Sequence, residues 1–285
     1  MRDTDLFKTQ LKTLFRPIYG GLAVAVAGSL LLGASAAGAA TTSAAPTSAA
    51  TPSAATPSAA AHAKQPRGIY AITFAPNSAL YRLNPGSHRA RLAGRTGVRL
   101  TDLAFRGRTL YAISFTDLYR LNARTGARHK IGKLGVSGAN ALATRPATNT
   151  LYGADRHGIL FRVNPFTGWA TIIGRFGRHL LSAGDLAFAD GHLYATVEHR
   201  GSTRSLLASV NARTGAAKVI GSTGYRNVYG LVTRNGALYG ATYSGKFLAI
   251  CRRTGRARAI WDDGLPIGGL AARSLGTWRA VPTVC

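Results

Sequence analysis

Two of the few acidic residues in this chain hold the same place in a repeated pattern. Asp102 and Asp185 each precede Leu-Ala-Phe, and Asn140 lies one residue earlier in the corresponding segment of its own unit. If these segments lie side by side, the three side chains could line a channel mouth and coordinate a cation or a substrate hydroxyl, because hard cations prefer oxygen ligands. The alternative, which we favour, is that they cap the starts of strands and accept hydrogen bonds from backbone amides.

A second group of ionisable side chains falls in two neighbouring loops and comprises Asp155, His157, Glu198 and His199. A metal site or a His/Glu pair of the lyase type is conceivable there, but no spacing such as HExxH supports it. The chain also contains no phosphate loop, cysteine cluster or nucleophile elbow. We therefore predict no metal, no cofactor and no catalytic residue, and we expect a non-enzymatic protein. The alternative is a lyase or hydrolase with a site at the channel mouth.

The charge balance is strongly basic, with 36 Lys and Arg against 10 Asp and Glu and a net charge of +26. Such a field attracts polyanions, namely nucleic acid, anionic lipid or acidic polysaccharide. Candidate ligand-binding residues lie in loops expected on one face: Arg95, Lys133, Arg156, Arg175, His179, Arg226 and Lys246. The opposite turns are basic as well, so a uniformly basic particle without a site is the alternative.

A repeat of about 42 residues positions all of these side chains. A Tyr preceded by Leu or Ile recurs at Tyr70, Tyr111, Tyr152, Tyr194 and Tyr239. Each is followed by a second strand-like segment such as LYRLN, then usually by Thr-Gly, then by Ile-Gly, and then by an apolar segment such as DLAF. Asn-x-x-Thr-Gly is typical of a hairpin turn, because Asn caps the turn and Gly accepts a positive φ. Four short strands in about 42 residues predict one propeller blade.

The order of segments also predicts how the ring closes. The first unit lacks an apolar segment upstream of Tyr70, and the chain has a spare one at 269–272. We expect this C-terminal strand to complete the first blade of an all-β, five-bladed β-propeller. A sixth, incomplete blade formed by 277–285 is the alternative. Two units depart from the pattern, with Ser87-His88 in place of Thr-Gly and Ile260-Trp261 in place of Ile-Gly.

The repeat resembles the secreted bacterial propeller repeats related to the NHL and YVTN groups, and the resemblance covers nearly all of 68–273. It implies a propeller fold. It implies little about function, since such repeats serve in binding, in scaffolding and occasionally in enzymes.

The N-terminal part differs from the repeat region. Residues 1–39 combine a basic start, an apolar run and small residues, which predicts a signal peptide or, alternatively, an uncleaved membrane anchor. Residues 40–66 are rich in Ala, Thr, Ser and Pro and predict a flexible linker before the propeller domain at 67–285.

Cys251 and Cys285 are the two cysteines, and in an exported chain we expect them to form a disulfide rather than remain free.

These features together predict an exported, monomeric binding propeller at the cell envelope or secreted from the cell. Its expected partner is an anionic polymer, such as a glycan, an envelope polymer or nucleic acid. The alternative partner is an envelope protein, for which the propeller would be a scaffold.

Overall fold

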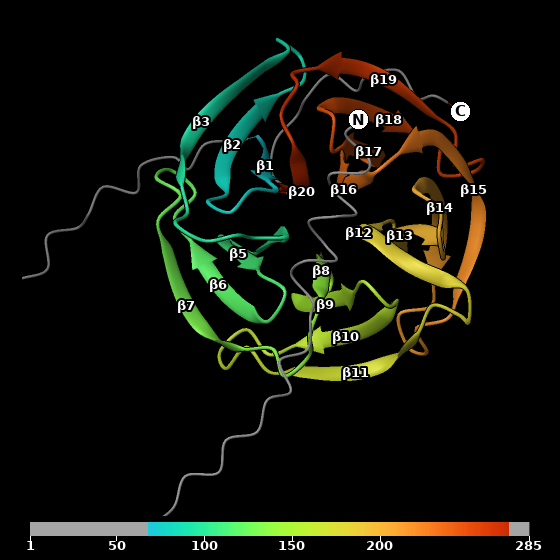
Figure 1. Cartoon of the computed structure of the whole chain (residues 1–285), viewed down its shortest axis with the longest axis horizontal. Helices are drawn as coiled ribbons and strands as arrows, with labels where there is room; N and C mark the ends of the chain where they lie inside the picture. Colours follow the sequence, from blue (N-terminus) through green and yellow to red (C-terminus); the bar gives the residue numbers. More distant parts are fainter. Residues whose placement is uncertain (1–67, 274–284) are drawn as a thin grey trace, which may run out of the picture. The chain divides into compact units, whose positions relative to one another are not determined.

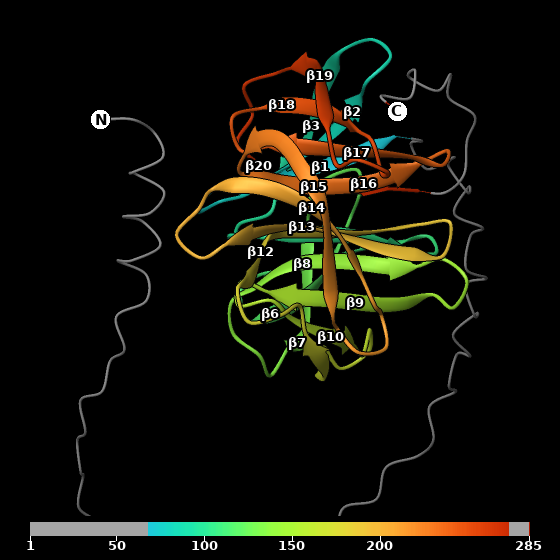
Figure 2. The ribbon, with the colours of Figure 1, turned by 90° about the vertical axis from the view of Figure 1, so that its right-hand side faces the viewer.

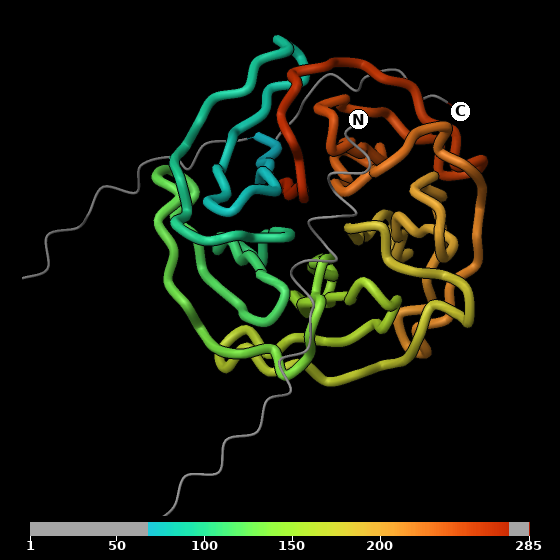
Figure 3. The backbone as a smooth tube through the Cα atoms, in the orientation of Figure 1, coloured from blue at the N-terminus to red at the C-terminus, as the bar shows by residue number. Residues whose placement is uncertain are grey.

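A computed structural model of the chain describes residues 68–273 and Cys285. These residues form strands and loops without any helix, and the strands make five four-stranded antiparallel sheets. Figure 1 shows the sheets arranged as blades around a central axis, and the tube in Figure 3 shows the chain passing from blade to blade around the ring. The predicted five-bladed β-propeller is confirmed. Within the described part of the chain no helix has the length and apolar character needed to cross a bilayer.

Each blade is an up-and-down sheet that runs from an inner strand at the axis to an outer strand at the circumference. Blade 1 is β20 (Ile267–Ala272), β1 (Ile69–Thr73), β2 (Ala79–Asn84) and β3 (Arg89–Arg95). Blade 2 is β4 (Asp102–Arg106), β5 (Thr109–Ile113), β6 (Asp117–Leu121) and β7 (Arg128–Lys133). Blade 3 is β8 (Ala139–Arg145), β9 (Thr150–Asp155), β10 (Ile159–Val163) and β11 (Ala170–Arg175). Blade 4 is β12 (Leu180–Ala189), β13 (His192–His199), β14 (Arg204–Val210) and β15 (Ala217–Arg226). Blade 5 is β16 (Val228–Arg234), β17 (Ala237–Thr242), β18 (Lys246–Ile250) and β19 (Ala257–Asp262).

The ring closes through the C-terminal strand, as predicted. β20 pairs antiparallel with β1, and Ile69 lies opposite Ala272. Blade 1 therefore contains the first and the last strands of the described chain. The alternative sixth blade would be formed by 277–285, and all of these residues except Cys285 lie outside the described residues.

The core lies between neighbouring blades rather than inside any one of them. The Tyr70 ring of blade 1 packs edge-on against Phe105 of blade 2, and Tyr152 of blade 3 packs in the same way against Phe188 of blade 4, with 5.3 Å between ring centroids in both pairs. Each blade presents two apolar faces because its strands are buried on both sides, so a single repeat cannot bury its core alone.

The recurrent Thr-Gly and Ile-Gly pairs form one contact between adjacent blades. The outer strands run around the circumference, so the end of each one reaches the outer turn of the next blade (Figure 1). Figure 2 shows the twist that makes this possible, with β15 crossing the inner strands of its blade. A Cβ atom on Gly132 would lie 2.1 Å from the carbonyl oxygen of Thr167, and Gly94, Gly174 and Gly221 meet the next turn in the same way. Glycine is required at these positions because the two backbones touch.

The two departures from the repeat meet at the seam where blade 5 closes onto blade 1. Trp261 replaces the glycine of the last outer strand, and His88 replaces the glycine of the first turn. Their rings stack 6.2 Å apart with an interplanar angle of 14°. At this seam a stacked pair of rings therefore replaces the glycine contact of the other blade junctions.

The outer turn of blade 5 also carries a covalent link to the end of the chain. Cys251 and Cys285 form a disulfide with their Cα atoms 5.1 Å apart.

Candidate functional site

The inner strands expose one backbone edge to the central channel, and this edge defines the site. In an antiparallel ladder every second residue turns its N–H and C=O away from the paired neighbour. In the inner strands these residues include one leucine from each blade: Leu103, Leu142, Leu186, Leu231 and Leu270. Unpaired buried N–H groups are costly, so the channel must supply acceptors for them.

Two carboxyl groups supply those acceptors. Asp102 accepts N–H bonds from Leu103 at 2.7 Å and from Leu142 at 2.5 Å. Asp185 accepts N–H bonds from Leu186 at 2.6 Å, from Leu231 at 2.5 Å and from Leu270 at 3.3 Å. All five blades are thus joined at the axis through two side chains, both of which have no exposed surface.

The other blades have small residues where Asp would stand, because the two carboxyl groups fill the axis. The corresponding residues are Ala141, Gly230 and Gly269. A Cβ atom on Gly269 would lie 2.0 Å from Oδ1 of Asp102, and one on Gly230 would lie 2.6 Å from Cγ of Leu270.

The two carboxyl groups are hydrogen-bonded to each other, and they share a proton. Burial raises the pKa of Asp102 well above its usual value, and the adjacent Asp185 raises the pKa of Asp102 further. Burial also raises the pKa of Asp185 well above its usual value, although the hydrogen bond from Asp102 and three backbone N–H groups act to lower it. Asp185 accepts three backbone N–H bonds and Asp102 accepts two, so we place the negative charge on Asp185 and the proton on Asp102.

This geometry corresponds to the favoured alternative from the sequence, in which Asp102 and Asp185 bond to backbone amides. The positive ends of five N–H groups point at the carboxyl oxygens, which stabilises a shared negative charge and leaves poor geometry for a cation. Asn140 does not join the pair, because its Nδ2 donates to the carbonyl oxygen of Ser182 at 3.1 Å. The sequence pattern missed the contacts between blades, since the offsets do not show which strands face each other across the axis.

The second ionisable group also has a structural explanation. Oδ1 of Asp155 accepts N–H bonds from His157 and Ile159, both at 2.9 Å, and so it shapes the loop between β9 and β10. Within residues 68–273, no three His, Cys, Asp or Glu side chains form a cluster that could hold a metal ion.

The predicted basic residues lie at the ends of strands and in loops, mostly away from the axis. Arg95, Lys133 and Arg175 end the outer strands of three consecutive blades and are exposed. The equivalent residues of blades 4 and 5 are Ser222 and Asp262. The three basic residues therefore form a group on blades 1 to 3, which we call the outer-strand triad.

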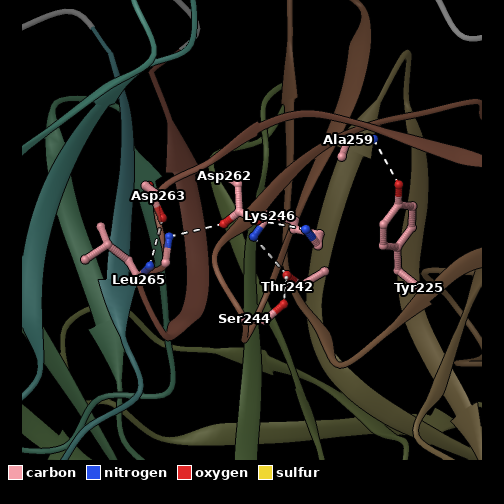
Figure 4. A network of polar contacts seen from close by, with 9 residues as sticks. Tyr225, Thr242, Ser244, Lys246, Ala259, Asp262, Asp263 and Leu265 are labelled. Carbon is pink, nitrogen blue, oxygen red and sulfur yellow. Dashed lines mark hydrogen bonds and ion pairs between the residues drawn. The ribbon is translucent and has the colours of Figure 1, made fainter.

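The remaining predicted basic residues have separate local environments. Lys246 forms an ion pair with Asp262 at 2.7 Å, within the polar network of Figure 4. Arg226 donates to Thr203 at 3.0 Å, and Arg156 donates to the His157 ring at 3.3 Å. His179 is exposed in the loop between β11 and β12. Nη1 of Arg175, a member of the triad, donates to the His157 carbonyl at 3.3 Å, so Arg156 and Arg175 both contact His157.

The two sets of loops that were expected on opposite faces also meet at the circumference. Nη1 of Arg128, in the outer turn region of blade 2, donates to the Thr96 carbonyl at 2.6 Å, beyond the end of the outer strand of blade 1.

A cavity of about 560 Å³ occupies the other part of the channel. Its closed end is the leucine layer, and it opens on the side where the inner hairpins turn, which we call the hairpin face (107–108, 146–149, 190–191 and 235–236). Arg108, Arg234 and Arg273 line its open end, together with Asp190. Sequence reasoning did not select these residues, although Arg106, Arg145, Arg234 and Arg273 directly follow the apolar inner-strand segment in four of the five units.

No family model matches the chain, and no curated protein matches it. Several solved structures are similar. A structure described as a nidogen/laminin complex is 14% identical, with 72% of this chain and 98% of that chain covered and a TM-score of 0.49. A protein of unknown function from Bacteroides thetaiotaomicron is 16% identical, with 61% and 53% covered and a TM-score of 0.47. The extracellular domain of a putative one-component system from the same genus is 16% identical, with 67% and 26% covered and a TM-score of 0.40. At these identities and scores the likeness says nothing about a ligand.

Proposed function

We propose that this chain is an exported, non-enzymatic binding propeller whose basic circumference holds an anionic polymer of the cell envelope. The observation that supports this function is the distribution of charge. Asp102, Asp155 and Asp185 are buried and bonded to backbone amides, and the ion pairs between described residues do not include them. The exposed bases therefore retain their field, which attracts polyanions.

The outer-strand triad is the part of this surface with the most regular spacing. Arg95, Lys133 and Arg175 occur once in each of blades 1 to 3, so an extended polymer lying along this part of the circumference would meet a positive charge at each blade. The resemblance of the repeat to the NHL and YVTN groups belongs to this proposal and is compatible with a binding role.

Salt-dependent binding tests the function. Duplex DNA serves as a probe of uniform charge density, because each phosphate contact releases counterions and contributes about 0.9 to the slope of log K against log salt. Changing Arg95, Lys133 and Arg175 to Gln should lower that slope by up to about 2.7. The matched control changes Arg124, Arg213 and Arg253, which share one position in the outer turns. Binding that is insensitive to salt, or a control with the larger effect, would refute the proposal.

A protein partner is the second candidate, and the outer turn of blade 3 favours it. Phe166 is 78% exposed and Trp169 is 61% exposed, whereas the corresponding residues of blade 4 are Arg213 and Ala216. Exposed aromatic side chains are enriched in protein interfaces. Changing both aromatic residues to Ala should abolish specific cross-links to an envelope protein on intact cells, and unchanged cross-links would exclude this turn.

A further inference from the structure

We propose that the channel cavity on the hairpin face binds a small anion that carries several hydroxyl groups, of the sugar-acid class. This site is separate from the outer-strand triad, so it does not depend on the polymer-binding function. A cavity of about 560 Å³ lies within the range of roughly 300–1,000 Å³ that is usual for small-molecule sites.

The walls of the cavity favour a ligand with many hydrogen-bonding groups. The leucine N–H bonds to Asp102 and Asp185 identify which residues turn their backbone toward the axis. By the same alternation, the residues two positions further along the inner strands turn their N–H and C=O into the cavity. Five residues occupy this position and all of them line the cavity, namely Phe105, Thr144, Phe188, Thr233 and Ala272.

Two of these residues are threonines, but the Oγ1 atoms of Thr144 and Thr233 are buried away from the cavity. The exposed backbone N–H and C=O groups of the inner strands therefore form the polar wall. A polar wall of this kind is costly when an apolar group covers it, so it selects hydroxyl groups that both donate and accept.

The open end of the cavity favours a negative charge. Arg108 is exposed there, Arg234 is 7% exposed, and the guanidinium of Arg273 lies 5.8 Å from the centroid of the Phe105 ring. Asp190 is the carboxylate at this end, and Arg252 holds it at 2.5 Å. Three arginines and one carboxylate thus line this end of the cavity. The guanidinium nitrogens of Arg234 are buried, and the carboxylate already has a partner.

The closed end determines how the ligand lies. The pair formed by Asp102 and Asp185 carries one negative charge behind the leucine layer and blocks passage through the channel. An anionic group is therefore repelled from the closed end and attracted to the arginines, while hydroxyl groups point inward. This polarity distinguishes a sugar acid from a neutral sugar and from a simple carboxylate.

Calorimetric titration of the intact chain with glucuronate, glucose and acetate tests the site. We expect glucuronate to bind at least tenfold more tightly than either of the others, because it alone satisfies both the walls and the open end. Equal binding of glucuronate and acetate would reduce the cavity to a plain anion site and overturn the proposal. Absence of glucuronate binding at millimolar concentration would overturn it as well.

A charge reversal at the open end provides the second measurement. Arg108→Glu should weaken glucuronate binding about tenfold, the loss of one charge-assisted contact, and it should leave folding intact because Arg108 is exposed on a hairpin turn. Arg213→Glu makes the same change of charge in an outer turn and should alter binding less than twofold. If the two variants weaken glucuronate binding equally, the binding depends on the net charge of the protein and not on the cavity, and the proposal is overturned. If Arg108→Glu keeps the salt-dependent binding of DNA, then polymer binding at the outer-strand triad is independent of the cavity site.

Discussion

The carboxyl pair at the axis leads us to predict unequal losses of stability for two similar substitutions, Asp102→Asn and Asp185→Asn. In Asp102→Asn the new amide still donates to Asp185, as the protonated acid does. In Asp185→Asn the charge disappears, and an N–H donor replaces an oxygen that accepts from the backbone. The first variant should therefore be much better tolerated than the second.

The magnitudes follow from the number of N–H groups that lose an acceptor. Asp185 accepts three backbone N–H bonds. Its Oδ1 atom accepts from Leu186, and its Oδ2 atom accepts from both Leu231 and Leu270. If each buried donor costs about 1–3 kcal/mol when its acceptor is lost, Asp185→Asn should lower the free energy of unfolding by about 3–5 kcal/mol. Asp102→Asn loses one acceptor and keeps the bond to Asp185, so about 1–2 kcal/mol is expected.

The same pair predicts how stability depends on pH. The raised pKa values mean that the folded protein holds a proton that the unfolded chain releases above about pH 4. Stability from this pair is therefore fully present below about pH 4 and is lost as the pH rises toward the raised pKa, by up to about 1.4 kcal/mol per pH unit. Asp102→Asn has no such proton, so its stability should lack this component of the slope.

Denaturant unfolding of the two variants and the parent protein between pH 4 and pH 8 measures both effects. Asp190→Asn is the control, since Asp190 lies at the surface and its loss should leave the pH slope unchanged. Equal destabilisation by the two Asn variants would contradict the assignment of proton donor and acceptor. Parallel pH curves for Asp102→Asn and the parent protein would contradict the shared proton.

Three further predictions concern contacts that hold the ring together, and thermal or denaturant unfolding checks each of them. Gly132→Ala should destabilise by about 1–3 kcal/mol, because the new methyl group forces two blades apart; an unchanged midpoint would refute the backbone contact. Trp261→Gly should destabilise by about 2 kcal/mol, and adding His88→Gly should cost little more, because the two rings act as a pair; additive losses would argue against the seam. Cys285→Ser should lower stability by about 3–4 kcal/mol in the chain-entropy account of a disulfide to Cys251, and an identical melting temperature would show that the link contributes nothing.

The sequence was sufficient to predict the strands, the number of blades and the closing strand, because these features repeat. Five tyrosines at nearly constant steps required a recurring unit, and the spare apolar segment at 269–272 had one unfilled position to occupy. Local rules of turn formation explain why Asn and Gly recur at the outer turns.

The contacts between repeats could not be derived in this way. The departures at His88 and Trp261 fall in separate units of the sequence, although the two side chains lie against each other in the structure. Asp102 and Asp185 were visible as polar residues at strand starts, but their bonds to three other blades depend on the narrow axis. The arginines of the hairpin face were not predicted, because the candidate binding residues all come from loops at the opposite ends of the strands.

The pairing of β1 with β20 has a mechanical consequence. The chain enters the ring at Gly68, beside Ala272, and runs into the interior of a blade rather than along its edge. Tension transmitted from the preceding residues along β1 would load the hydrogen bonds to both β20 and β2 in shear, so that many bonds must yield together. Tension at the other terminus would pass through the disulfide into blade 5 and spare the closing strand. The pairing of β1 with β20 and the disulfide thus allow the closed ring to resist a pulling force applied at Gly68 or at Cys285.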